Sequence, residues 1–321
     1  MVQNGFLLYK NMWIAVFLTG EWRTFEKCMP YLLQNLVFYK DPVRVFCCIQ
    51  GSKHVDSEAW IRSSLGSAFG SLTWFDPSDT DWLSSLNASK KRLQEIGDYW
   101  IQYLAHHSGS IIEYYQLWLA FPHMLMYEKD HDLVFDFVVR TRTDVLLCKP
   151  ILDWLHWTPQ EWDEYWLRLL GLDPKMDAIP IRDAMNSLVR SGPFKNELSL
   201  LHDTDPVLFH NWSELRDYLL TGKYVLTYRK NIMYVVPRRV FLHADLGITY
   251  GSDRMEIHSH WFDAESQLQT HFYKGLGLSV FDSVTWSEGS SLYTYKKSDY
   301  WNDDGSLRNL QDCLFFLLRH F

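Results

Sequence analysis

The side chains best suited to chemistry lie in one short segment, Arg140-Thr-Arg-Thr-Asp144, which directly follows the apolar run 133–139. Such a run is typical of a buried central strand. If the chain stays extended, every second side chain lies on the same side, so Arg140, Arg142 and Asp144 would lie together. Two guanidinium groups can then bind a diphosphate while the carboxylate holds a divalent cation. The other interpretation is a satisfied network of arginine and aspartate at a sheet edge, because buried charges must be paired.

A second polar segment, Thr19-Gly-Glu-Trp-Arg23, follows the first apolar run of the chain. The surrounding pattern predicts a strand, an amphipathic helix and a second strand, over 13–18, 25–38 and 43–49. This order implies a parallel pair in an α/β sheet, whose ligands bind beyond the carboxyl ends of the strands. There, backbone N–H groups near Gly20, the Thr19 hydroxyl and the Arg23 side chain could hold a phosphate. One glycine and one arginine after a strand are common, so this segment alone is a weak signal.

Two carboxylates in the second half of the chain are candidates for a general base. Asp245 precedes a short strand predicted over 246–250, and Glu265 lies at the start of a helix predicted over 265–274. Either carboxylate could remove a proton from a sugar hydroxyl or accept a hydrogen bond from one. Their alternative roles are structural: Asp245 as a turn former and Glu265 as a partner of the helix dipole.

The composition narrows the classes of function. The chain has 321 residues, 31 Lys and Arg against 39 Asp and Glu, and a formal net charge of −8. This balance excludes a simple nucleic-acid binder, which needs a basic excess, and 47% hydrophobic residues exclude a disordered chain. Aromatic residues make up 16% of the chain, with 15 tryptophans. Their flat faces suit sugar rings and nucleobases as well as ordinary cores.

Several other classes lose support because their sequence signals are missing. The five cysteines form no CxxC pair, which disfavours a structural zinc site and fits a reducing compartment. With no run of about 20 apolar residues, we expect no membrane span and a cytoplasmic protein. No GxGxxG, GxxxxGK[ST], HExxH or GxSxG motif occurs. A dehydrogenase, a P-loop NTPase, a zinc protease and an α/β-hydrolase are therefore disfavoured.

The remaining pattern predicts further elements around these segments. Thr158 and Glu161 are spaced as a capping box, which predicts a helix start after Thr158. A Ser/Gly-rich loop is expected near 108–110, and Pro122 is expected to kink or restart a helix. The other helices are predicted over 57–65, 82–103, 111–128, 213–220 and 306–318, and the other strands over 224–228 and 232–236.

Four segments together resemble the GT-A type of glycosyltransferase. They are Leu18-Thr-Gly-Glu-Trp-Arg23-Thr-Phe-Glu26, Val138-Val-Arg-Thr-Arg-Thr-Asp144-Val-Leu-Leu147, Ala244-Asp245 through Gly251-Ser-Asp-Arg-Met255, and Glu265-Ser-Gln-Leu268. Their order and spacing are more specific than any one motif. As a soluble enzyme of this type, the chain resembles the glycosyltransferases of large algal viruses and of bacterial polysaccharide loci. One expectation is therefore a viral protein that acts in the host cytoplasm.

The resemblance implies a fold and a site. The fold would be α/β, with a mixed, mainly parallel sheet flanked by helices. Residues 1–150 would form a Rossmann-like half that binds the nucleotide-sugar, and residues 151–321 an acceptor-binding half packed into the same body. The donor would be bound by residues of both polar segments: Thr19, Gly20, Arg23, Arg140, Arg142 and Asp144. Asp245 and Glu265 would be the catalytic carboxylates.

The cofactor expectation follows from the same resemblance and from one departure. Asp144 corresponds to the metal-binding aspartate of a DxD motif, which implies Mn²⁺ or Mg²⁺. Arg142 stands where that motif has its first aspartate. Two interpretations stay open: a cation held by Asp144 with other ligands, or a weak or absent metal requirement with Arg142 supplying the positive charge.

The function implied is transfer of a hexosyl or pentosyl group from a UDP- or GDP-sugar to a hydroxyl of a glycan or glycoprotein. We expect inversion at the anomeric carbon, because Asp245 and Glu265 offer a base for the acceptor. One alternative is a catalytically silent carbohydrate-binding protein on the same fold, suggested by the altered DxD motif and the many tryptophans. A glycoside hydrolase is a third possibility, but no close carboxylate pair supports it.

Overall fold

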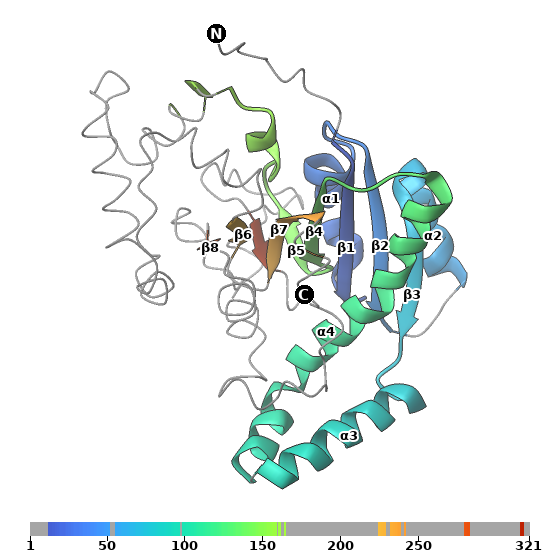
Figure 1. Cartoon of the computed structure of the whole chain (residues 1–321). Helices are drawn as coiled ribbons and strands as arrows, with labels where there is room; N and C mark the ends of the chain where they lie inside the picture. Colours follow the sequence, from blue (N-terminus) through green and yellow to red (C-terminus); the bar gives the residue numbers. More distant parts are fainter. Residues whose placement is uncertain are drawn as a thin grey trace, which may run out of the picture.

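Seven strands form one mixed sheet in the order β3-β2-β1-β4-β7-β6-β8 (Figure 1). A computed structural model describes residues 12–51, 55–96, 98–158, 160, 161, 164, 224–228, 232–238, 241, 279–282 and 315–317. The strands of the sheet are β1 (Ile14–Glu21), β2 (Val43–Gln50), β3 (Phe69–Phe75), β4 (Phe137–Arg142), β6 (Tyr224–Tyr228), β7 (Met233–Pro237) and β8 (Ser279–Asp282). Most neighbours are parallel, and β7 pairs antiparallel with both β4 and β6. The predicted α/β class with a mixed, mainly parallel sheet is confirmed.

The centre of the sheet is β1, which pairs in parallel with β2 on one side and β4 on the other. Its first six residues are buried, and so is most of β2. Strands covered on both faces read as continuous apolar runs, which is why both were visible in the sequence. The chain moves from β1 outward to β2 and β3, and later returns to place β4 on the opposite side of β1. This reversal is a topological switch point.

Helices cover both faces of this sheet. The helices are α1 (Phe25–Leu32), which continues as a π-helical segment (Leu33–Val37), α2 (Val55–Leu65), α3 (Thr80–Ile96) and α4 (Asp98–His131). Ile14, Val16 and Leu18 belong to a core cluster that includes residues of α1, and Ala15 and Phe17 belong to a second one that includes residues of α4. The alternation of side chains along β1 therefore separates the two packing layers. Figure 1 shows α4 crossing the sheet, with α3 beside its first turns.

Several predicted elements are confirmed with shifted ends. The predicted strands 13–18, 43–49, 224–228 and 232–236 correspond to β1, β2, β6 and β7, and the helices 25–38 and 57–65 correspond to α1 with its π-helical extension and to α2. The strand predicted over 133–139 begins only at Phe137. The capping box is present, because the backbone N–H of Glu161 donates to Thr158 Oγ1 at 3.2 Å and that of Thr158 to Glu161 Oε2 at 2.7 Å.

Other predictions are wrong. The expected loop near 108–110 lies inside the continuous helix α4, which also contains Pro122 and does not restart there, whereas the alternative of a kink at Pro122 stays a prediction. The helix predicted over 306–318 is contradicted at its end, where β9 (Phe315–Leu317) pairs antiparallel with β5 (Val145–Leu147) in a small second sheet. Strand β3 was missed because its sequence, FGSLTWF, carries glycine and serine and lies at the sheet edge. The helices and strand predicted over 213–220, 246–250 and 265–274 lie outside the described residues.

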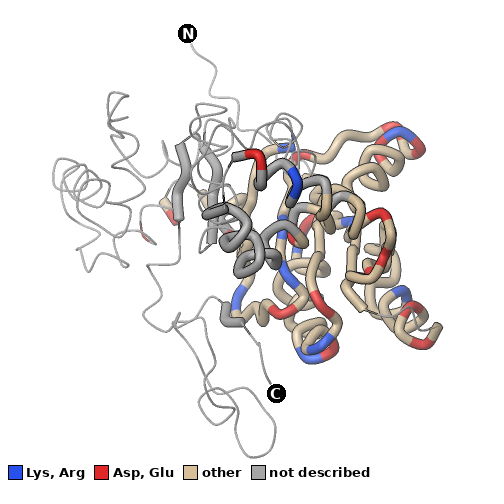
Figure 2. The backbone as a smooth tube through the Cα atoms, turned by 90° about the horizontal axis from the view of Figure 1, so that it is seen from below, with Lys and Arg blue, Asp and Glu red and all other residues tan. Residues whose placement is uncertain are grey.

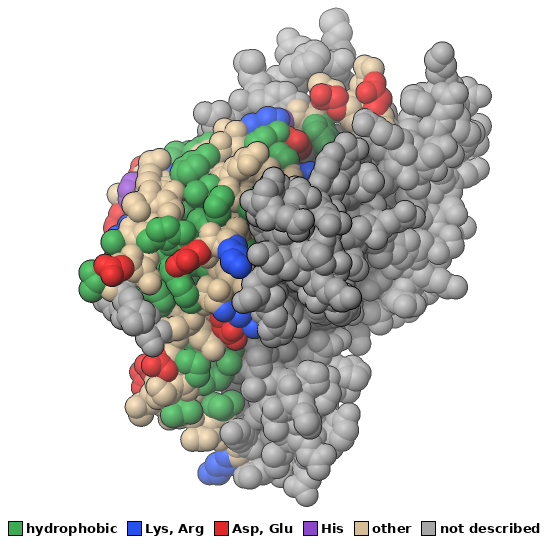
Figure 3. Space-filling model, turned by 180° about the vertical axis from the view of Figure 1, so that it is seen from behind, with side chains coloured by type: hydrophobic (Ala, Val, Ile, Leu, Met, Phe, Trp, Pro, Cys, Tyr) green, Lys and Arg blue, Asp and Glu red, His purple; other side chains and the backbone are tan. Residues whose placement is uncertain are grey.

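Charge and apolar surface are mixed over the described part of the molecule. Basic and acidic residues are interspersed along the chain (Figure 2). On the face seen in Figure 3, hydrophobic side chains lie between charged ones. Of the helices in the described part, none combines the length and apolar character needed to cross a bilayer. The division of the chain into a nucleotide-sugar-binding half, residues 1–150, and an acceptor-binding half, residues 151–321, stays a prediction.

A buried ion pair joins the end of α4 to the end of β7. Arg238 donates from Nε and Nη2 to the two carboxylate oxygens of Glu128, at 2.8 and 2.7 Å. Glu128 also accepts the backbone N–H of Phe135 at 3.2 Å. Both side chains are almost fully enclosed. The pair therefore fixes where the long helix ends, just before the chain enters β4.

We predict that Glu128→Ala lowers the free energy of unfolding by about 3–5 kcal/mol, because it leaves the buried Arg238 without its carboxylate. Urea unfolding followed by circular dichroism measures this loss. The matched control is Glu58→Ala, which removes an exposed pair with Arg62 on α2 and should cost less than about 1 kcal/mol. Equal losses in the two variants would contradict the structural role of the buried pair.

Candidate functional site

The two polar segments found in the sequence lie side by side at the carboxyl ends of β1 and β4. Thr19 is the register partner of Arg142 in this parallel pair. The backbone N–H of Thr143 donates to the carbonyl of Thr19 at 3.0 Å, which continues the pairing past the end of β4. The candidate site therefore lies at the switch point of the sheet, where open α/β sheets bind their ligands.

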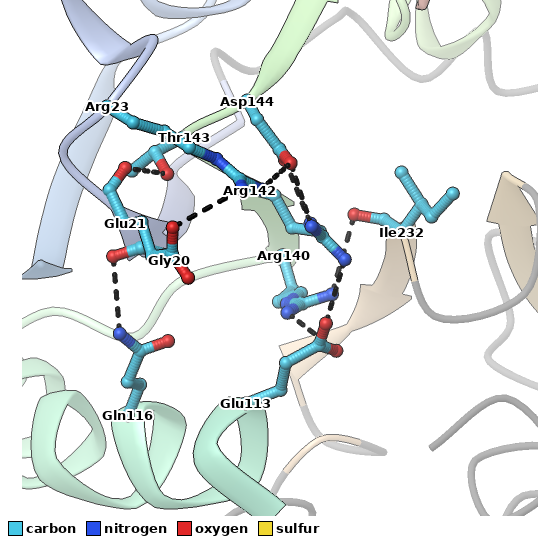
Figure 4. Close-up of polar contacts among 10 residues, drawn as sticks. All are labelled: Gly20, Glu21, Arg23, Glu113, Gln116, Arg140, Arg142, Thr143, Asp144 and Ile232. Atoms are coloured by element: carbon cyan, nitrogen blue, oxygen red, sulfur yellow. Dashed lines mark hydrogen bonds and ion pairs between the residues drawn. The ribbon is translucent and has the colours of Figure 1, made fainter. Parts of the chain in front are cut away.

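Six charged side chains form a continuous row of alternating sign at this edge, which we call the ion-pair chain (Figure 4). In order, its members are Glu21, Arg23, Asp144, Arg142, Glu113 and Arg140. The closest nitrogen to oxygen distances along it are 3.4, 3.3, 2.8, 2.9 and 3.1 Å. Three positive and three negative charges cancel, so this edge of the sheet carries charged groups without a net charge.

The strongest link in the ion-pair chain joins Arg142 to Asp144. Arg142 donates from Nε to Oδ1 at 2.9 Å and from Nη2 to Oδ2 at 2.8 Å, a bidentate contact. Its Nη1 donates to Glu113 Oε1 at 2.9 Å. Burial alone would lower the pKa of Arg142, but Glu113 and Asp144 outweigh that effect and raise it. The two carboxylates therefore stabilise the charged form of the guanidinium.

Glu113, which was not predicted from the sequence, is carried to the site by α4 from 29 positions before Arg142. Its two oxygens accept from Arg142 and, at 3.1 Å, from Arg140. One turn later, the buried Gln116 donates to the carbonyl of Gly20 at 3.2 Å. Two polar residues three positions apart inside an apolar helical run were the available signal.

Gly20 is required by the close approach of the two polar segments. Its φ is +141°, and a Cβ built on it would lie 2.3 Å from Thr143 Oγ1. The same hydroxyl donates to the carbonyl of Glu21 at 2.7 Å. A side chain at position 20 would push these segments apart. Thr19 is fully buried, so in this structure it contributes backbone contacts.

The three arginines differ in exposure. Arg140 is buried and also donates to the carbonyl of Ile232 at 3.4 Å, which gives it a positioning role. The side chain of Arg142 is 17% exposed and that of Arg23 is 36% exposed. Arg23 and Arg142 are therefore the cations that an incoming ligand can reach.

The predicted carboxylates Asp245 and Glu265 lie outside the described residues.

Aromatic rings line the neighbouring edge. Trp22, directly after β1, contacts Trp60 of α2 and Trp74 of β3, with ring centroids 5.6 and 6.0 Å apart. Phe25 packs edge-on against Trp22 and Trp60. All three indoles are only partly buried. They form a rigid apolar wall beside the ion-pair chain, of the kind that packs against a base or a sugar ring.

The described residues do not fit a divalent cation at Asp144. Both oxygens of Asp144 and both of Glu113 accept N–H groups from arginine, and a cation would lie close to two guanidiniums. In the described part of the chain, no group of three or more His, Cys, Asp or Glu side chains is arranged to hold a metal ion. The predicted requirement for Mn²⁺ or Mg²⁺ stays a prediction.

Comparison of the sequence with models of known protein families gives no match, and comparison with curated protein sequences gives none either. A functional interpretation of this chain consequently depends on three features of its own structure. These are the switch point between β1 and β4, the ion-pair chain, and the tryptophan wall beside it.

We predict that Gly20→Ala lowers the free energy of unfolding by roughly 2–5 kcal/mol, since it adds backbone strain to a steric clash with Thr143. Gly66→Ala is the matched control, because Gly66 also has a positive φ, +49°, but its Cβ would meet nothing within 4 Å. Strain alone should cost about 1–2 kcal/mol there. Urea unfolding of both variants tests this, and a loss at Gly20 no larger than at Gly66 would argue against the close approach.

Proposed function

We propose that the chain is a glycosyltransferase of the GT-A type. It would move a hexosyl or pentosyl group from a UDP- or GDP-sugar to a hydroxyl of a glycan or glycoprotein. The observation that carries the proposal is the position of Arg23 and Arg142 at the switch point between β1 and β4. Nucleotides bind in that crevice in open α/β sheets, and guanidinium groups are matched in shape and charge to phosphate oxygens.

The outer end of the ion-pair chain, where Arg23 contacts Glu21, can free Arg23 for a diphosphate at little cost in stability. Arg23 contacts Glu21 at 3.4 Å and Asp144 at 3.3 Å, the two longest links of the chain. Glu21 is 47% exposed, so its pair with Arg23 stabilises the fold by at most about 1 kcal/mol. Arg23 can leave this partner for a diphosphate without exposing a buried charge.

The chemistry of the transfer requires positive charge at the leaving group. The bond between the sugar C1 and the β-phosphate oxygen breaks, and its electron pair stays on the nucleoside diphosphate. The acceptor oxygen forms a new bond to C1, and its proton passes to a base, for which Asp245 and Glu265 remain the candidates. Arg23 and Arg142 would stabilise the negative charge that develops on the diphosphate.

The tryptophan wall supports a ligand with a flat or ring-shaped part. Trp22 directly precedes Arg23, so a molecule whose phosphates contact Arg23 would bring its base or sugar close to Trp22. Stacking on an aromatic face contributes about 1–3 kcal/mol for a nucleobase and tolerates different bases. This arrangement favours a nucleotide-sugar over inorganic phosphate.

One observation favours the second candidate, a catalytically silent carbohydrate-binding protein. The ion-pair chain is electrically balanced in itself, as a purely structural network at a sheet edge would be. Such a protein would bind glycans without any nucleotide. The two candidates therefore differ in a single measurable property, the affinity for a nucleoside diphosphate.

We predict that UDP or GDP raises the thermal unfolding temperature, because a ligand that binds only the folded state stabilises it. Isothermal titration should then show Arg23→Ala weakening that binding about tenfold or more, through loss of charged hydrogen bonds. Asp144→Asn should abolish sugar transfer with the fold intact, because it removes the carboxylate that orients Arg142, while Glu113 still pairs with the guanidinium.

Arg62→Ala is the control for this experiment. Arg62 stacks over Phe69 at the opposite, amino-terminal end of β3, 4.3 Å from the ring centroid, and should leave nucleotide affinity unchanged. If no nucleotide among UDP, GDP, CMP and dTDP binds at millimolar concentration, the transferase proposal fails. Glycan binding without nucleotide would then support the silent protein.

A further inference from the structure

We propose that Arg142 takes the place of a divalent cation, so that the site binds a nucleoside diphosphate without metal. This inference rests on the proposed function and deepens it. The geometry that points to it is the bidentate contact of Arg142 with Asp144, at 2.9 and 2.8 Å, together with the third contact to Glu113. Asp144 then acts as a positioning residue for a guanidinium.

The carboxylate of Asp144 is fully engaged by this contact. Oδ1 accepts from Arg142, and Oδ2 accepts from both Arg142 and Arg23. A cation could bind there only after at least one guanidinium had moved away. Arg142 is poorly placed to move, because it is the last residue of β4 and a second carboxylate, Glu113, accepts a hydrogen bond from its Nη1.

Electrostatics favours the same assignment. A divalent cation beside Asp144 would lie next to the guanidiniums of Arg142 and Arg23, and like charges at that distance in a partly buried site repel strongly. Glu113 cannot compensate, since its two oxygens are engaged by Arg142 and Arg140. The local balance of charge is already satisfied without an added ion.

Arg142 also has the donors that the role requires. Its contacts with Asp144 and Glu113 use three N–H groups, one each on Nε, Nη1 and Nη2. A guanidinium has five N–H groups, so each terminal nitrogen keeps one for a phosphate oxygen. The carboxylates fix the plane of the group before a ligand arrives, which lowers the entropy lost on binding.

Two titrations test the proposal on the wild-type protein: nucleotide binding, measured in EDTA and in Mn²⁺, and binding of Mn²⁺ to the protein without EDTA. Isothermal titration with UDP and with GDP should give dissociation constants that agree within about twofold between the two conditions. Electron paramagnetic resonance of Mn²⁺ added to the protein alone should show no ion bound in stoichiometric amount. A loss of nucleotide affinity of tenfold or more in EDTA, restored by Mn²⁺, would overturn the proposal.

In the variant Arg142→Ala, nucleotide binding should become dependent on Mn²⁺. In EDTA its nucleotide affinity should fall about tenfold or more, the loss expected for charged hydrogen bonds. Mn²⁺ should restore part of that affinity, because the oxygens of Asp144 become available. Arg142→Lys keeps the charge but loses the bidentate geometry, and should fall between wild type and Arg142→Ala.

The outcomes separate this inference from the proposed function. If no nucleotide binds in EDTA or in Mn²⁺, the transferase proposal fails. The resonance measurement still shows whether the protein binds Mn²⁺ at Asp144. Stoichiometric Mn²⁺ binding by wild type that Asp144→Asn removes would show that Asp144 is a metal ligand. That result would overturn the role of Arg142 even if nucleotide binding were found.

Discussion

The bidentate contact between Arg142 and Asp144 is the interaction on which the candidate site depends, because every other charged member is placed relative to it. Asp144 is nearly inaccessible, and Arg142 is mostly enclosed between β4 and α4. Neither charge could remain there unpaired, so the two side chains fix each other and recruit Glu113 and Arg23 as outer partners. The sheet brings the two residues together, since Arg142 ends β4 and Asp144 lies two residues beyond it.

Two further features hold the polar segments of this edge in register. Gly20 lets the turn after β1 approach Thr143 more closely than any residue with a side chain could. On the other face, buried Asn35 in the π-helical segment donates to the carbonyl of Leu147 at 2.7 Å, which ties the end of α1 to β5. These two contacts hold in place the backbone that carries the charged groups of the site.

The sequence was sufficient for the parts of the molecule that obey local rules. The runs that became β1, β2 and the first half of β4 are mainly apolar, and Thr158 and Glu161 form the expected capping box. The resemblance implied that Arg23, Arg142 and Asp144 share one site, and the parallel pairing of β1 with β4 places them at one edge. Periodicity in the sequence did not predict the elements that form by pairing with distant parts of the chain, such as β9, which pairs with β5.

Glu113 shows most clearly why part of the site escaped prediction. Its partners lie 29 and 27 positions further along the chain, and only the path of α4 across the sheet brings them together. The expected loop at 108–110 and the expected break at Pro122 would have divided that path. Helix packing against the sheet overrode the local preference of glycine, serine and proline, and a carboxylate inside an apolar run became a central member of the site.

The cancellation of charge within the ion-pair chain also governs how ligands reach the site. A cleft lined by one sign of charge draws oppositely charged molecules from a distance and speeds their capture. Here the three arginines are neutralised within a few ångströms by their own carboxylates, and the protein as a whole carries a charge of −8. An anionic ligand would therefore receive no long-range attraction from the protein, and added salt, which screens the net negative charge, would not slow its association.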